Sequence, residues 1–167
     1  MKIIIRITLL ALLIPTMSYG EDEQHHQIEH VIGVDALSSD LRDLLNQEMR
    51  ALQSGMQSII PAYVSGNWDD IATTAGKMKN SYILKQSLTE SQIKQLHSLL
   101  PVAFIEQDKR FHYLAGMLEH VAKNKNPELT NFYFSKMNEA CVTCHSQFAT
   151  HRFPALLSKN KTSEHSH

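Results

Sequence analysis

Residues 127–151 read PELTNFYFSKMNEACVTCHSQFATH, and this stretch decides both the fold class and the chemistry that we expect of the chain. Apolar side chains recur in it every three or four residues, the spacing of one helix face. Pro127 would occupy an early position of this helix, where proline is tolerated. The pattern predicts a helix from about Pro127 to His151. The inward positions are expected to be Leu129, Phe132, Tyr133, Met137, Ala140, Cys144 and Phe148.

Three more amphipathic segments precede this one, and we find no alternating strand pattern of any length. The first begins at Ser38 and is long, with Gly66 as its stop signal. The second opens on Asn67 and ends before residue 86. The third starts with TESQ at 89–92, which has the form of a capping box, and runs to about residue 121. Pro101 should kink or break it, because proline removes a helical hydrogen bond.

Four helices with short connections predict an all-α protein, folded as an antiparallel up-down-up-down four-helix bundle. We expect the bundle to occupy residues 36–155. A polar, histidine-rich segment at 21–35 precedes it, and a disordered polar tail at 156–167 follows. Loose metal chelation by the terminal histidines is possible chemically, but solvated tails are the preferred interpretation.

Residues 1–20 have the layout of a secretory signal peptide, with basic Lys2 and Arg6, a short apolar run and small residues before Gly20. We expect cleavage after Gly20 and a mature protein in the periplasm. An uncleaved segment acting as a membrane tether is the alternative. No other apolar run approaches the length of a membrane span, so no stable span is expected.

The charge balance argues against a nucleic-acid partner. Removing Lys2 and Arg6 from the 16 basic side chains leaves 14 against 17 acidic ones. The mature chain is therefore mildly acidic, whereas nucleic acids and anionic membranes attract a concentrated basic face.

The motif with the clearest chemical meaning is Cys141-Val142-Thr143-Cys144-His145. In the Cys-x-x-Cys-His pattern two thioether bonds hold the edge of a haem, and the adjacent histidine coordinates the iron from one side. On a helix, cysteines three residues apart lie on the same face. The sequence therefore predicts one covalently attached haem c.

Three rival interpretations use the same cysteines. A thioredoxin-like pair needs its first cysteine at a helix start, whereas Cys141 lies some four turns into the predicted helix. A structural zinc site needs further ligands, and no second cysteine pair exists. A disulfide within one helical turn is geometrically awkward and leaves His145 without a role.

On this motif the chain resembles the cytochrome c-prime family, including its low-spin, six-coordinate relatives. The likeness extends from about Leu37 to Phe153 and includes Phe148, an aromatic residue three positions after His145. A weaker match in the first helix runs through Glu48-Met49-Arg50 to Met56. The resemblance implies an exported four-helix bundle with one haem near its C-terminal end, and a methionine or leucine facing the open side of that haem.

Two departures from the family pattern concern arginines. The family often has an arginine four residues after the haem histidine, where this chain has Ala149, with Arg152 three positions on. The family's first helix tends to carry an arginine one turn before the distal residue, where this chain has Leu45, with Arg42 a further turn back. The resemblance therefore does not carry the gas-binding role of the first arginine over to Arg152, and it leaves open whether Arg42 substitutes for the second.

The second iron ligand decides the function. If His151 and Ala36 are level in an antiparallel bundle, His145 is level with about residue 42. The haem reaches about 10 Å further, or roughly seven residues at 1.5 Å each, which indicates Met49. Met56 lies about two turns deeper and is expected to be core, while core packing is also the alternative for Met49. The third segment offers His97, His112 and His120, for which solvated or hydrogen-bonded roles are preferred.

With His145 and Met49 as ligands the protein is predicted to be a one-electron carrier and not an enzyme, serving a redox partner protein of a periplasmic electron-transfer chain. A vacant sixth position would instead give a binding protein for nitric oxide or carbon monoxide. Peroxide reduction would want a distal acid/base pair, for which only Glu48 and Arg50 lie near the right level. The sequence does not decide whether the protein forms a homodimer.

Overall fold

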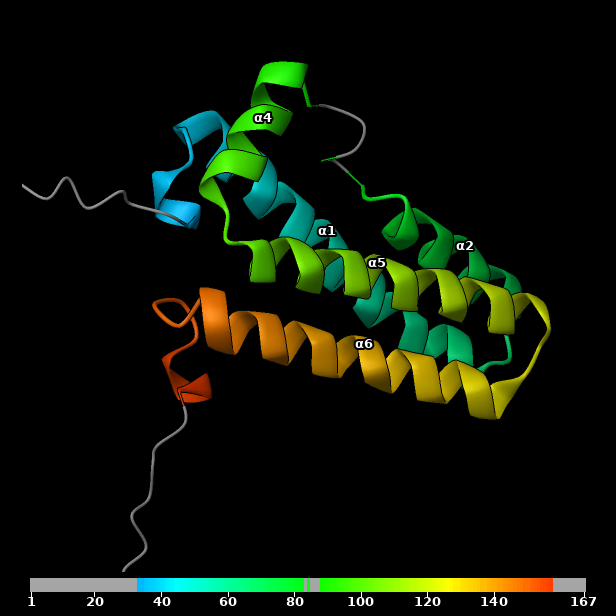
Figure 1. The fold of residues 1–167 in the computed structure, drawn as a ribbon. Helices are drawn as coiled ribbons and strands as arrows, with labels where there is room; N and C mark the ends of the chain where they lie inside the picture. Colours follow the sequence, from blue (N-terminus) through cyan, green and yellow to red (C-terminus); the bar gives the residue numbers. More distant parts are fainter. Residues whose placement is uncertain (1–32, 83, 85–87, 158–167) are drawn as a thin grey trace, which may run out of the picture.

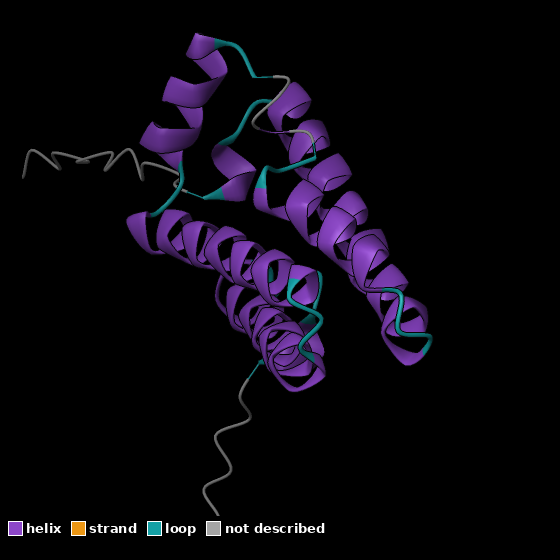
Figure 2. Cartoon of the chain, turned by 90° about the vertical axis from the view of Figure 1, so that its right-hand side faces the viewer, coloured by secondary structure: helices purple, strands orange, loops and turns teal. Residues whose placement is uncertain are grey.

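The computed structural model describes residues 33–82, 84 and 88–157. Its helices are α1 (Ser39–Val64), α2 (Trp68–Lys79), α4 (Glu90–Leu99), α5 (Val102–Lys123) and α6 (Pro127–Phe148), with short 3-10 turns η1 (Val34–Ala36) and η2 (Pro154–Leu156). The described part contains no strand (Figure 2). The predicted all-α class is therefore confirmed.

Two of the predicted start signals are confirmed as caps, but Ser38 is not: it precedes α1 without a side-chain cap, and its hydroxyl donates to Gln95 Oε1 at 2.9 Å instead. The Asn67 side chain accepts a hydrogen bond from the Asp70 N–H and opens α2. Thr89 and Gln92 form the reciprocal capping box at the start of α4. The Asn126 side chain accepts from the Leu129 N–H at 2.9 Å, with Pro127 next in the chain. These contacts satisfy backbone donors that have no partner within their own helix.

The break at Pro101 is confirmed. α4 ends at Leu99 and α5 begins at Val102, so the third predicted segment is two helices. Figure 1 shows α4 standing at an angle to α5 at the end of the molecule that also holds the carboxyl end of α6. α6 itself ends at Phe148, three residues before the predicted end at His151.

The predicted outer boundaries of the bundle lie close to two short turns. The limits at 35/36 and 155/156 each fall inside a 3-10 turn, η1 and η2 respectively. The signal peptide and the terminal histidines at 25, 26, 30, 165 and 167 lie outside the described residues. None of the helices in the described part combines the length and the apolar character needed to cross a membrane.

Apolar side chains gather in two clusters. The main cluster joins α2, α5 and α6 to the second half of α1, and its buried members include Ile59, Ile71, Leu118 and Met137. A smaller cluster surrounds Leu41 and Leu100 near the start of α1. α2 packs on both α1 and α5, and α5 packs on α6.

Two predicted inward positions of α6 are wrong. Leu129 and Phe132 are 45% and 49% exposed. α6 packs through the face on which Thr130, Met137 and Ala140 are buried. Met137 and Ala140 were predicted to point inward, whereas Leu129 and Phe132 lie off this face. The sequence pattern included Leu129 and Phe132 because their side chains are apolar, although apolar character alone does not place a residue on the packed face.

Candidate functional site

The Cys-x-x-Cys-His motif lies in the second half of α6. Cys141 and Cys144 are three residues apart, so they share a helix face, and both thiols are free and partly buried. Cys141 packs against the main apolar cluster. The helix thus presents two thiols in a row along an apolar surface, with His145 directly after the second.

Both thiols are partly shielded from water. Burial raises the pKa of both, that of Cys144 to about 11, where the Asp108 carboxylate adds to the effect. Redox-active thiol pairs have a lowered pKa, supplied by a helix N-terminus or a neighbouring cation. Neither cysteine has that environment, because Cys141 lies well inside α6.

His145 is partly buried near the carboxyl end of α6. Its imidazole stacks on the ring of Phe153, with 4.3 Å between ring centroids and 9° between planes. Burial, followed by the charge of Arg152, lowers the pKa of His145. The neutral ring, which is the form that binds metal ions, is therefore favoured at neutral pH.

The carboxyl end of α6 lies beside the amino-terminal part of the described chain. His151 and Phe148 line a small hollow together with Asp35. The Phe148 ring also meets the Phe104 ring edge-on at 5.4 Å between centroids. The sequence analysis assumed that His151 and Ala36 lie at the same height along the bundle, and the proximity of His151 to Asp35 agrees with that assumption.

A hydrogen bond joins this end of α6 to α1. Arg152 Nη1 donates to Asn46 Oδ1 at 2.6 Å. Asn46 and Met49 are three residues apart and therefore lie on the same side of α1. Met49 is partly buried and packs against both apolar clusters. Met56, in contrast, is buried in the main cluster, as expected of a core residue.

The three histidines considered as alternatives to Met49 are either hydrogen-bonded or exposed to solvent. His112 is hydrogen-bonded to the Met78 carbonyl oxygen at 2.7 Å and faces Asp108 at 3.4 Å. His97 and His120 are exposed, and His120 is bonded to Asn124. Over the described ranges no three side chains of His, Cys, Asp or Glu gather as a metal site.

Glu48, which lies near the level expected for a distal acid or base, faces the interior of the protein. Its side chain is buried and only 1% exposed. The carboxylate accepts hydrogen bonds from the backbone N–H groups of Tyr82 at 3.0 Å and Leu84 at 3.3 Å. Glu48 therefore holds the segment after α2 against α1. Arg50, two residues further along α1, is exposed.

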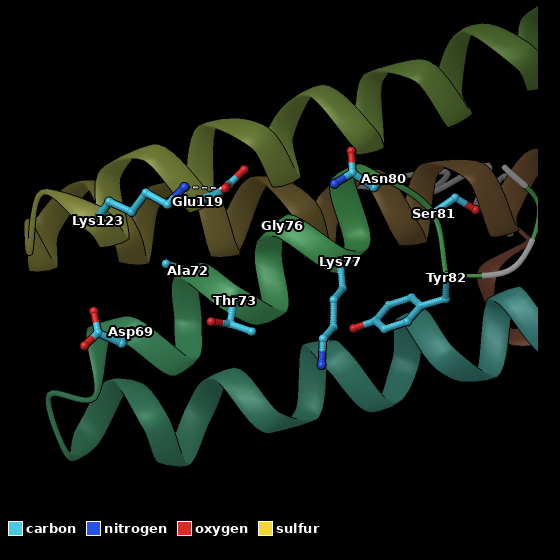
Figure 3. Close-up of a pocket in the computed structure, with 10 residues that line it drawn as sticks. All are labelled: Asp69, Ala72, Thr73, Gly76, Lys77, Asn80, Ser81, Tyr82, Glu119 and Lys123. Carbon is cyan, nitrogen blue, oxygen red and sulfur yellow. Dashed lines mark hydrogen bonds and ion pairs between the residues drawn. The ribbon is translucent and has the colours of Figure 1, made fainter. Parts of the chain in front are cut away.

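A broad open groove lies elsewhere, between α2 and α5 (Figure 3). Its charged side chains include Glu119, which forms ion pairs with Lys79 at 3.2 Å and Lys123 at 2.6 Å. The groove contains none of the motif residues. Its acidic and basic groups neutralise one another, so its size alone assigns it no chemistry.

No protein-family model matches the chain, and neither the curated proteins nor the solved structures gave a match.

Proposed function

We propose that the protein is an exported mono-haem c-type cytochrome that carries single electrons in the periplasm. Haem c would be attached through Cys141 and Cys144, with His145 and Met49 as the two axial ligands. In this proposal α1, α2, α5 and α6 form the antiparallel four-helix bundle around the haem, as in the cytochrome c-prime proteins that the sequence resembles.

The donor set carries this proposal. Two thiols on one helix face, followed at once by a histidine, are the groups that covalent haem attachment requires. Cys141 packs against the main apolar cluster and both thiols are partly buried, which suits a macrocycle that is itself largely apolar. A haem c bound there would supply the one-electron chemistry of its iron.

The choice of Met49 rests on the contact between Arg152 and Asn46. That hydrogen bond brings one side of α1 to the end of α6, and Met49 is on that side. Met49 also lies where the two apolar clusters meet, so its thioether is held by packing from both. A ligand restrained in this way changes position little when the iron changes oxidation state.

The experiment is an absorption spectrum of the reduced, purified protein with and without carbon monoxide. Sharp low-spin bands that do not respond to the gas are expected for ligation by His145 and Met49. A high-spin spectrum that shifts when carbon monoxide is added would contradict Met49 ligation and favour a gas-binding protein.

A further inference from the structure

The chain reverses direction directly after α6. The Ala149 N–H donates to the His145 carbonyl at 3.1 Å, and the N–H groups of Arg152 and Phe153 both donate to the Ala149 carbonyl at 3.0 Å. We refer to residues 149–153 as the strap. Its hydrogen bonds bring Phe153 back over the last turn of α6, beside His145.

Within the strap, Phe153 covers one face of the His145 imidazole. The rings are nearly parallel, 4.3 Å apart at their centroids. Phe153 remains 39% exposed, so this contact is not simple burial in the core. A metal ion binds an imidazole nitrogen in the plane of the ring, whereas Phe153 lies against its face. Stacking and iron ligation are therefore compatible.

The far end of the strap is tied to α1. The Arg152 guanidinium donates a hydrogen bond to the side chain of Asn46 on α1. The strap thus connects the helix that carries His145 with the helix that carries Met49. Rotation of the imidazole about its Cβ–Cγ bond would lose the stack, and movement of the strap would lose the bond to Asn46.

We infer that the strap sets the orientation of the axial imidazole, with Phe153 as the positioning residue and Arg152 as its anchor. This inference rests on the proposed function. Groups that contact a metal ligand without touching the metal fix the ligand's orientation and tune the metal's electronic properties. Here the contact is aromatic stacking, so it restrains the plane of the ring and leaves its nitrogens accessible.

The test uses the full, exported, haem-bearing chain in its oxidised form. Proton NMR of the hyperfine-shifted haem methyl signals reports the orientation of the axial imidazole plane. Phe153→Leu should change the spread of these signals, whereas Phe153→Tyr, which keeps the stack, should retain the wild-type pattern. Phe132→Leu is the matched control, because Phe132 is another exposed phenylalanine and lies 13 residues before His145 on α6, about 20 Å along the helix.

A second variant tests the anchor without altering either ring. Arg152→Ala should shift the same signals in the same direction as Phe153→Leu but by less. Arg110→Ala, which removes an exposed arginine from α5, should leave them in place.

The outcomes separate the two proposals. A haem-bearing protein whose signals are unchanged in Phe153→Leu would overturn the inference and leave the proposed function standing. A chain purified without covalent haem would overturn both.

Discussion

The guanidinium of Arg152 donates a hydrogen bond to Asn46 Oδ1 at 2.6 Å, joining two residues that are 106 positions apart. This contact relates the carboxyl end of α6 to the first half of α1. It singles out the side of α1 that carries Asn46 and Met49, and it does so independently of the resemblance to a known family. Met56, two turns further along α1, belongs to the main core cluster.

Replacing Met49 by leucine is expected to remove one axial ligand while leaving an apolar side chain of similar volume. The reduced protein should change from a low-spin spectrum to a high-spin one that responds to carbon monoxide. Absorption spectroscopy of the purified variant checks this.

Met56→Leu is the matched control for this prediction. It makes the same chemical change in the buried cluster, where volume-conserving apolar substitutions cost less than about 1.5 kcal/mol. Its spectrum should remain low-spin. A low-spin Met49→Leu protein, or a high-spin Met56→Leu protein, would show that the ligand is assigned to the wrong methionine.

Glu48→Ala should destabilise the fold. The substitution removes the acceptor for the Tyr82 and Leu84 N–H groups, and leaving buried donors without a partner costs about 1–3 kcal/mol. Urea unfolding at neutral pH measures the loss. Glu106→Ala, at an exposed position of α5, should stay within about 0.5 kcal/mol of wild type. Equal effects of the two substitutions would refute a structural role for Glu48.

Gly55 marks the close approach of α1 to α2. A Cβ atom there would lie 2.7 Å from the Tyr82 hydroxyl and 3.3 Å from Met78 Sδ, and Met78 is fully buried. Gly55→Ala should therefore lower the free energy of unfolding by about 1–3 kcal/mol, as overpacking does.

Gly116→Ala on α5 provides the comparison. Its Cβ would meet only the flexible stem of Lys79, at 3.4 Å or more. The better helix propensity of alanine should then raise the free energy of unfolding by up to about 1 kcal/mol. Thermal unfolding of the two variants should shift in opposite directions. Similar shifts would mean that the α1–α2 contact is looser than described.

Glu119 should give a pH-dependent contribution to stability. The hydrogen bond from Lys123, and then the hydrogen bond and charge of Lys79, hold the pKa of this carboxyl below its usual value of 4.5. A lowered pKa in the folded state means that the ionised form stabilises the fold above the unfolded-state pKa, and that this contribution is lost as the pH falls through the folded-state pKa.

Comparing wild type with Glu119→Gln by urea unfolding tests this dependence. The difference in unfolding free energy should be present at pH 7 and shrink as the pH is lowered past about 4.5. A difference that stays constant over that range would show that the ion pairs with Lys79 and Lys123 do not contribute to the stability of the fold.

Local signals in the sequence predicted most helix limits. Thr89 with Gln92, and Asn67, bond to groups within three residues of themselves, and Pro101 separates α4 from α5. Pro61, in contrast, lies inside α1 near its end. Such short-range effects can be recognised without tertiary information. The motif at Cys141 to His145 is equally local, so its placement on one helix followed from the spacing.

Features that depend on contacts between distant segments were not predictable. Nothing in the sequence near Glu48 indicates that its carboxylate turns toward the backbone after α2. The reversal that returns Phe153 to His145 also has no local signature, because it follows from the early end of α6 at Phe148. For the same reason, the exposure of Phe132 depends on which stripe of α6 packs against α5.

The most direct measurement is mass spectrometry of peptides from the protein purified after export from a host that matures c-type cytochromes. The account predicts that the peptide containing Cys141, Cys144 and His145 carries the mass of one haem, attached through both cysteines. The same peptide recovered with two free thiols or with a disulfide, and without haem, would contradict it.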